Sequence, residues 1–367
     1  MSRNVGYLMR RIGLPPNTAR GELRVSPARI VTAVLPPVLR LAITSRCNFE
    51  CHFPSAPLIT WCHREGSKGN GPDACTEDVL GLAMLIRDIF GFEIARIAGL
   101  EASLHPRLAE IVSGLRDVGF RDISLTTNGS TISHNMERLR DAGLTGLSVS
   151  IPNFNRRRYF QITGVDCLEQ VISGVLKAQE MGLEVRVNRL LLNGSQADLP
   201  AFLDWAIETG LHVRLYELFW HPGIDGAFSK YYVSPYRYLP LWRSRYKRLE
   251  ISRYELPARE RWTFQIADGA SITTDKFLPK PTTGVCAHCE MRRRCREGLF
   301  GCGLRIGTDC CLVPCLLRPD LRIDYSDVVE LETSDVCDGS SSLFAKLAEL
   351  SPLLSSCTGD SMLTQVV

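Results

Sequence analysis

The sequence predicts an α/β fold, in which an open, partial barrel of parallel strands is followed by a smaller region of hairpins. The chain has 367 residues, 45% hydrophobic and 23% charged, which is typical of a globular protein with a sizeable core. Strand-like and helix-like segments alternate about six times between residues 37 and 220, as parallel βα units require. Six units are too few to close the usual βα barrel, so we expect the barrel to stay open.

Each barrel element has its own signal. Thr76 is placed to cap a helix, because acidic residues and then apolar residues at helical spacing follow it. Gly119, Gly182 and Gly210 are placed to end three later helices. The expected strands cover residues 39–44, 94–98, 122–127, 147–151, 185–192 and 212–219, and the later helices cover 106–118, 134–142, 168–181 and 198–209.

The pattern changes after the barrel. An aromatic and arginine-rich connector with one helix near 236–246 precedes a hairpin of strands 263–266 and 271–274 around an Asp268-Gly269 turn. The expected divisions are an N-terminal extension (1–36), the barrel (37–220), the connector (221–260), the hairpin-rich region (261–330) and a tail (331–367) with a short helix at 343–350.

Charge and hydropathy exclude several classes of protein. The chain has 43 Lys and Arg residues and 40 Asp and Glu residues, a net charge of +3. This near balance argues against a polybasic arm that binds nucleic acid, so we expect no nucleic-acid partner. No apolar run is long enough to cross a membrane, and the N-terminus lacks a secretory pattern. We therefore expect a cytoplasmic protein.

The 14 cysteines are clustered, which in a cytoplasmic chain points to metal rather than to disulfides. The first group is Cys47, Cys51 and Cys62, and it directly follows the first strand. Three thiolates on one loop can hold three irons of a [4Fe–4S] cluster and leave the fourth iron open. A zinc site is the alternative that the spacing also permits.

The segment "RCNFEC", resumed by "CHREG", resembles the radical S-adenosylmethionine (SAM) superfamily, whose hallmark is C-x3-C-x2-C after the first strand. The resemblance implies that Cys47, Cys51 and Cys62 hold a [4Fe–4S] cluster that cleaves SAM to a 5′-deoxyadenosyl radical. This chain departs from the hallmark, because Pro54 stands where the third cysteine is expected. Residues 54–61 read as an insertion, which a loop can absorb at modest entropic cost.

Further segments match the family in order from about residue 37 to 220. "RIAGLEA" stands where the family has its "GGEP" turn, and "LTTNG", "LSVSI", "VRVN" and "RLYELF" match later strand ends. The resemblance implies that Glu101 could face the SAM ammonium group. It implies SAM-binding roles for Phe53, Gly99, Glu101, Asn128, Ser150, Asn188 and Phe219.

The second cysteine group resembles the auxiliary-cluster (twitch or SPASM-type) extension of radical SAM enzymes. The resemblance is to the group around the GTP 3′,8-cyclase of molybdenum-cofactor synthesis. It implies that the region 261–330 is an auxiliary iron–sulfur domain with a second [4Fe–4S] cluster. The candidate ligands are Cys286, Cys289, Cys295 and Cys315, while Cys302, Cys310 and Cys311 leave the choice open. A structural zinc knuckle is the alternative.

Arginines at Arg40, Arg96, Arg186 and Arg305 fall where the cyclase group has cationic substrate contacts. Arginine suits bidentate binding of phosphate or carboxylate, so we expect an anionic substrate: a small molecule, a nucleotide or a modified peptide. A solvated or structural arginine is the alternative at each position. The chain ends at Val367 without the paired glycines of the cyclase, which favours a relative with another substrate.

The sequence thus predicts a radical SAM enzyme of the lyase, cyclase or oxidoreductase type in cofactor or natural-product biosynthesis. An electron donor such as flavodoxin or ferredoxin is the expected protein partner. The competing hypothesis is a catalytically retired iron–sulfur or zinc-binding regulatory protein, because Pro54 and the degraded glycine turn depart from the family pattern.

Overall fold

The computed structural model describes residues 29–32, 36–51, 70–220, 222, 224–238, 242, 248–254, 259–266, 269–278, 286–295 and 303–324. The predicted tail helix at 343–350 lies outside these residues. Among them, no helix is long and apolar enough to cross a bilayer.

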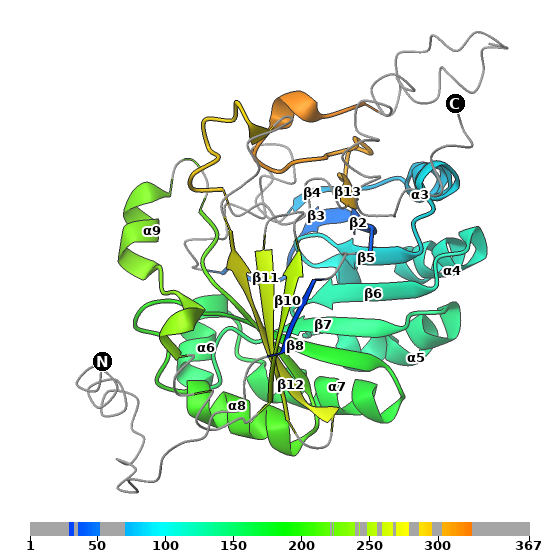
Figure 1. Cartoon of the computed structure of the whole chain (residues 1–367). Coiled ribbons are helices and arrows are strands. Elements are labelled where there is room, and N and C mark those ends of the chain that lie inside the picture. The colour runs from blue at the N-terminus through cyan, green and yellow to red at the C-terminus, as the bar shows by residue number, and fades with distance from the viewer. Residues whose placement is uncertain are drawn as a thin grey trace, which may run out of the picture.

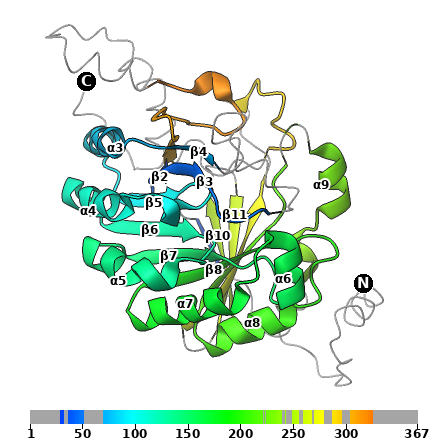
Figure 2. The same cartoon turned by 180° about the vertical axis from the view of Figure 1, so that it is seen from behind.

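The predicted parallel barrel is confirmed. Its strands are β2 (Val38–Ala42), β5 (Ile94–Ala98), β6 (Asp122–Thr127), β7 (Gly146–Ser150), β8 (Glu184–Leu190) and β9 (His212–Tyr216), which are neighbours in chain order and all parallel. The helices α3 (Thr76–Phe90), α4 (Leu108–Val118), α5 (Ile132–Ala142), α7 (Leu168–Glu180) and α8 (Leu199–Glu208) cover the outer face of the curved sheet (Figures 1 and 2).

The sheet continues beyond the six predicted strands. A meander of β10 (Arg248–Tyr254), β11 (Arg259–Gln265) and β12 (Ser271–Phe277) joins it, with β12 parallel to β9. Within the described residues the sheet has eleven strands, with β1 (Arg29–Thr32) at one edge and β13 (Gly303–Ile306) at the other. The predicted hairpin therefore belongs to the same sheet as the barrel, although the predicted boundary between the connector and the hairpin-rich region falls at residue 261. The domain boundaries stay a prediction.

Alternation along the strands separates an apolar outer face from a polar inner face. On β2, Leu39 and Leu41 are fully buried in the core that the outer helices share. Arg40 points to the opposite, inner face. Its charge interacts with Arg214 and Tyr216 on β9, which is five strands away from β2 in the sheet. Side chains from distant strands therefore meet inside the barrel.

Some local predictions are wrong. The N-cap of α3 is Cys75 rather than Thr76, whose hydroxyl is buried without a hydrogen-bond partner among the described residues. The connector has an unpredicted helix α9 at Asp225–Tyr231 and a 3₁₀ turn at Pro235–Tyr238, while most of the predicted helix at 236–246 lies outside the described residues. Helix α6 (Arg156–Thr163) and the short strand pair of β3 (Thr44–Arg46) and β4 (Asn70–Asp73) were not predicted from the sequence.

Candidate active site

The first cysteine group begins directly after β3, near the carboxyl edge of the barrel. Phe49 donates its backbone N–H to Cys47 Sγ at 3.4 Å, a contact that stabilises a thiolate. Cys47 and Cys51 are both half-buried. Phe53 and Cys62 lie outside the described residues.

The surroundings of both described thiols raise their pKa. Burial, and then the neighbouring Cys47, raises the pKa of Cys51 to about 12. Burial also raises the pKa of Cys47, although hydrogen bonds from Phe49 and Asn128 oppose the shift. Close, half-buried thiols ionise together when a metal centre supplies positive charge, which is the chemistry expected of cluster ligands.

Two parts of the barrel, the end of β6 and helix α6, hold the cysteine loop in place. Asn128 donates to Asn48 Oδ1 at 2.8 Å, and Asn48 in turn donates to Ser130 Oγ, so the loop is tied to the end of β6. Glu50 donates its backbone N–H to the carbonyl of Thr163 on α6 at 3.1 Å. The Asn128 side chain, expected to bind SAM, is thus engaged in fixing the loop.

Glu101 lies at the centre of this edge and is fully buried. Its Oε1 accepts hydrogen bonds from Ser103 and from Thr127 Oγ1, and its Oε2 accepts from Asn128 N at 2.6 Å. Burial raises the pKa of Glu101, although these donors oppose the shift. Both carboxylate oxygens of Glu101 accept hydrogen bonds from this chain. We therefore propose that Glu101 holds the turn after β5 in place and does not contact SAM.

Gly99 allows the turn between β5 and Glu101 to approach the cysteine strand. Its φ is +153°, and a Cβ built on it would lie 2.7 Å from the carbonyl oxygen of Thr44. The next residues bond to the same strand, Leu100 N to Thr44 O and Glu101 N to Arg46 O. A side chain at position 99 would therefore push the turn away from the cysteine loop.

Ser150 and Asn188 are register partners at the ends of β7 and β8. Asn188 Oδ1 is buried with no hydrogen-bond partner among the described residues. A buried carbonyl of this kind needs a donor, and a bound ligand can supply one. Phe219 lies beyond the end of β9 and packs edge-on against Phe277, with ring centroids 6.5 Å apart.

The second cysteine group is brought together around residues 315–318. Cys286 and Cys295 pack with Cys315 in one small apolar cluster that also contains Met291, Leu317 and Leu321. Cys289 lies beside the Arg318 side chain. Three of the four expected ligands therefore share this apolar cluster next to the segment that follows β13. Among the described residues, however, no three Cys, His, Asp or Glu side chains are placed to hold a metal ion.

Cys310 and Cys311 are engaged elsewhere, and Cys302 lies outside the described residues. The thiol of Cys311 donates to Asp324 Oδ1 at 2.9 Å. The thiol of Cys310 accepts the backbone N–H of Cys75 at the start of α3. We propose that neither ligates the auxiliary cluster.

The four expected arginines differ in their surroundings. Arg96 makes a bidentate ion pair with Asp122 at 2.5 and 2.6 Å, and Arg186 pairs with Glu184 at 3.0 Å. Each therefore already has a carboxylate partner, which a solitary substrate contact would lack.

Arg40 is different. Arg305 and Arg96 are its register neighbours on β13 and β5, and Arg40 forms no hydrogen bond or ion pair with a described residue. Burial, and then the charge of Arg305, lowers the pKa of Arg40 to about 10.

Further cations of the barrel interior were missed by sequence reasoning. Arg214 on β9 pairs with Asp275 on β12, which also accepts Arg259 and Arg261 from β11. Burial alone would raise the pKa of Asp275, but the three guanidinium groups lower it well below its usual range. The alternation along β11 and β12 could have indicated that these charged residues share one face. The sequence did not predict that β12 pairs with β9.

Comparison with known proteins now assigns the class. Residues 41–206 match the model of the radical SAM superfamily. The chain is similar to a probable GTP 3′,8-cyclase of Methanocaldococcus jannaschii, with 29% identity over 78% of this chain and 87% of the relative. The corresponding protein of Saccharolobus islandicus is also 29% identical, over 81% and 88%. The crystal structure of Streptococcus suis SuiB shares the fold at TM-score 0.51 and 13% identity, covering 92% of this chain and 70% of that one.

The chain therefore carries a radical SAM domain and is an enzyme of the radical SAM type. This sets aside the hypothesis of a retired, non-catalytic relative. Enzymes of this family use a [4Fe–4S] cluster and SAM. The described residues fit the first cluster and SAM, with two thiols and an N–H donor at the carboxyl edge and an unsatisfied Asn188 carbonyl beside Ser150. For a second cluster, three thiols pack together, but no three described side chains are placed as metal ligands.

Proposed function

We propose that this enzyme abstracts hydrogen from an anionic, phosphate-bearing small molecule bound inside the barrel, with a nucleotide as the leading class. The observation that carries the proposal is Arg40, which lies between Arg305 and Arg96 in one row of the sheet and lacks a carboxylate partner among the described residues. Arg40 is half-buried among like charges, an arrangement that an anion would stabilise. Arginine binds phosphate with bidentate geometry, which favours a phosphate group there.

The other basic residues support Arg40 in different ways. Arg96 and Arg186 have carboxylate partners, so their contribution to an anion is weaker than the sequence suggested. Arg214 on β9 also has a carboxylate partner, Asp275, and its guanidinium is 4.9 Å from the ring centroid of Tyr216. A triphosphate is the first anion to test, because the relatives at 29% identity are named for a reaction of GTP.

The remaining site residues follow from the arrangement. Cys47, Cys51 and Cys62 would hold the SAM-binding cluster, and Cys286, Cys289, Cys295 and Cys315 the second one. Ser150 and Asn188, with Phe53 and Phe219, would bind SAM, while Gly99, Glu101 and Asn128 keep the cysteine loop in register. When bound, the first cluster supplies the electron that cleaves SAM to the radical that abstracts hydrogen.

The test compares two arginine variants after anaerobic reconstitution. Arg40→Ala removes the guanidinium group that has no carboxylate partner among the described residues. The control, Arg138→Ala, removes an exposed arginine on α5. We expect Arg40→Ala to weaken GTP binding at least about tenfold while SAM affinity changes less than about twofold. Equal loss of both would assign Arg40 to SAM, and unchanged GTP binding would contradict an anion site at Arg40.

A further inference from the structure

The inner side of α6 is fastened to the cysteine loop. Thr163 on α6 accepts the backbone N–H of Glu50 at 3.1 Å. Tyr159, fully buried, meets the ring of Phe49 edge-on with centroids 6.4 Å apart. Phe49 and Glu50 both lie between Cys47 and Cys51, so α6 is in direct contact with the loop expected to hold the catalytic cluster.

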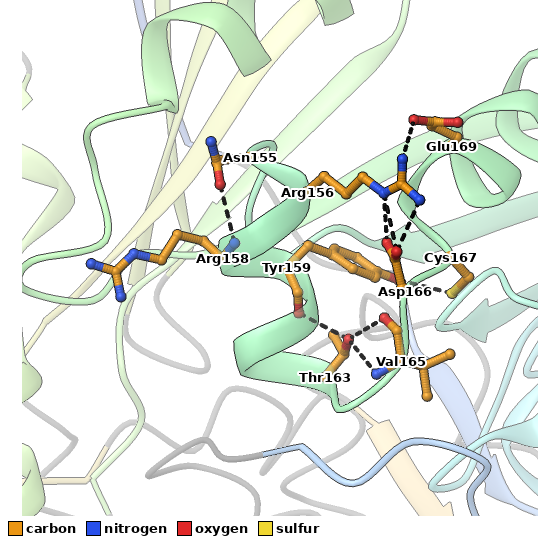
Figure 3. Close-up of polar contacts among 9 residues, drawn as sticks. All are labelled: Asn155, Arg156, Arg158, Tyr159, Thr163, Val165, Asp166, Cys167 and Glu169. Carbon is orange, nitrogen blue, oxygen red and sulfur yellow. Dashed lines mark hydrogen bonds and ion pairs between the residues drawn. The ribbon is translucent and has the colours of Figure 1, made fainter.

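The opposite side of α6 is basic and exposed. Figure 3 shows Arg156 turned toward Asp166 and Glu169, while Arg158 extends on another side of the helix. Arg158 contacts only the amide of Gln161, and Arg157 forms no hydrogen bond or ion pair within the described part of the chain. Two guanidinium groups on this face therefore lack a carboxylate partner among the described residues.

A large apolar group accompanies these charges. The side chain of Phe160 is 49% exposed and neighbours Arg157 on the helix surface. Aromatic and arginine side chains are the types enriched at protein–protein interfaces. The exposed face of α6 thus has the composition of a docking surface.

A cleft of about 820 Å³ opens beside this face. Arg157 and Arg158 line one wall, Asn193 and Ser195 after β8 another, and Tyr231 of α9 borders it. The acid at the cleft, Asp198, is already bonded to Arg189, whose side chain is fully buried. The charge that the cleft offers to a partner is therefore positive.

From these contacts we propose that the exposed face of α6, with its cleft, is the docking surface for an acidic electron-carrier protein. This inference rests on the proposed function, because SAM cleavage needs one electron from outside the enzyme. The carrier is oxidised by one electron and the cluster is reduced by the same electron, with no other co-reactant. Docking on α6 would seat the carrier on the helix that contacts the Cys47–Cys51 loop.

The test uses two reductants that differ in their need for docking. A flavodoxin in its reduced hydroquinone form must dock, whereas dithionite is small and need not. The variant is Arg157→Glu with Arg158→Glu, and the control with the same charge change is Arg121→Glu with Arg138→Glu, which lie away from α6. Phe160→Ala is a second variant on the docking face that leaves the charges intact.

We expect the α6 charge variant to slow cluster reduction by flavodoxin at least about tenfold at low ionic strength, with a weaker salt dependence. Reduction by dithionite and dithionite-driven SAM cleavage should match the wild type, as should both assays for the control. Flavodoxin binding, followed by flavin fluorescence without any turnover, should weaken in parallel and weaken also for Phe160→Ala.

Two results would overturn the docking surface. One is wild-type binding and reduction by flavodoxin in the α6 variants, and the other is an equal loss with flavodoxin and dithionite. Failure of the proposed function would look different, because the wild-type enzyme itself would then not cleave SAM with dithionite. The flavodoxin binding measurement decides the inference in that case as well.

Discussion

Glu101 Oε2 accepts a hydrogen bond of 2.6 Å from the backbone N–H of Asn128, so a carboxylate beyond β5 is fixed at the end of β6. Asn128 also donates to Asn48, which lies between the two described cluster cysteines. One buried carboxylate therefore links the turn after β5, the end of β6 and the cysteine loop. We infer that the sequence signal at Glu101 marks a residue that positions the loop.

Replacing Glu101 by Gln should destabilise the protein, because the amide nitrogen cannot accept the hydrogen bonds that the second carboxylate oxygen accepts. We expect the free energy of unfolding to fall by about 1–3 kcal/mol, measured by urea unfolding. The exposed Glu110→Gln on α4 is the control and should change stability by less than about 0.5 kcal/mol. An equal effect of the two substitutions would contradict the positioning role.

A second prediction concerns Gly99 in the same turn. Gly99→Ala should place a Cβ 2.7 Å from the carbonyl oxygen of Thr44, at a φ of +153°. We expect a loss of about 1–3 kcal/mol in stability together with weaker iron retention, since the turn that contacts the cysteine strand must move. Gly226→Ala, with nothing within 4 Å of its Cβ, is the matched control and should leave both measurements near the wild type.

The parallel barrel was predictable because each unit is local. The ranges of β5 and β6 match the prediction at both ends, since alternating apolar residues end at turn glycines or polar residues. Gly119 adopts the left-handed conformation that ends α4, as expected. Helix α6 was missed because its three consecutive arginines carry no apolar periodicity, and it is held instead by an Asn155 cap and by Tyr159.

The site was harder to predict than the fold, because its contacts join residues far apart in the sequence. Ser150 and Asn188 could be placed at neighbouring strand ends from their segments alone. The ion pair between Arg96 on β5 and Asp122 on β6, and the pairing of β12 with β9 that brings Asp275 to Arg214, depend on sheet order and register. One strand's alternation cannot specify those partners.

The Arg189–Asp198 pair yields a pH-dependent prediction. Burial alone would raise the pKa of Asp198, but hydrogen bonds and charge from Arg189 lower it below its ordinary value of 3.8. A folded-state pKa below the unfolded one adds stability above pH 3.8 that is lost as the pH falls through the folded-state value. Stability from this pair should therefore be complete at neutral pH.

Asp198→Asn should cost about 3–5 kcal/mol at pH 7, because it leaves the buried Arg189 without its carboxylate. The difference from the wild type should narrow when urea unfolding is repeated below pH 3.8. Asp117→Asn, at an exposed position on α4, is the control and should differ little from the wild type at either pH. A pH-independent difference for Asp198→Asn would contradict the linkage.

If the second cysteine group holds its own cluster, removing that group should remove only part of the bound iron. Cys286→Ala combined with Cys289→Ala should lower bound iron by about half, as expected for one of two [4Fe–4S] sites. SAM cleavage without substrate should persist, while turnover of substrate fails. Cys311→Ala is the matched control, because its thiol is hydrogen-bonded to Asp324. Loss of iron in the control, or full iron in the double variant, would contradict the assigned ligands.

The spacing C-x3-C-x10-C makes the last prediction, since it assigns the third cluster ligand to Cys62 and leaves Cys75 out. Cys75 is the N-cap residue of α3, and its exposed thiol donates to Glu77 at 3.3 Å, so it is already engaged beyond β4. We expect Cys62→Ala to abolish 5′-deoxyadenosine formation and Cys75→Ala to leave it near the wild-type level. Anaerobic assays with dithionite, alongside iron counts and the electron paramagnetic resonance signal of the reduced protein, provide the measurement. If Cys75 were required and Cys62 dispensable, the third thiolate would come from the start of α3, and residues 54–61 would not be an insertion within the motif.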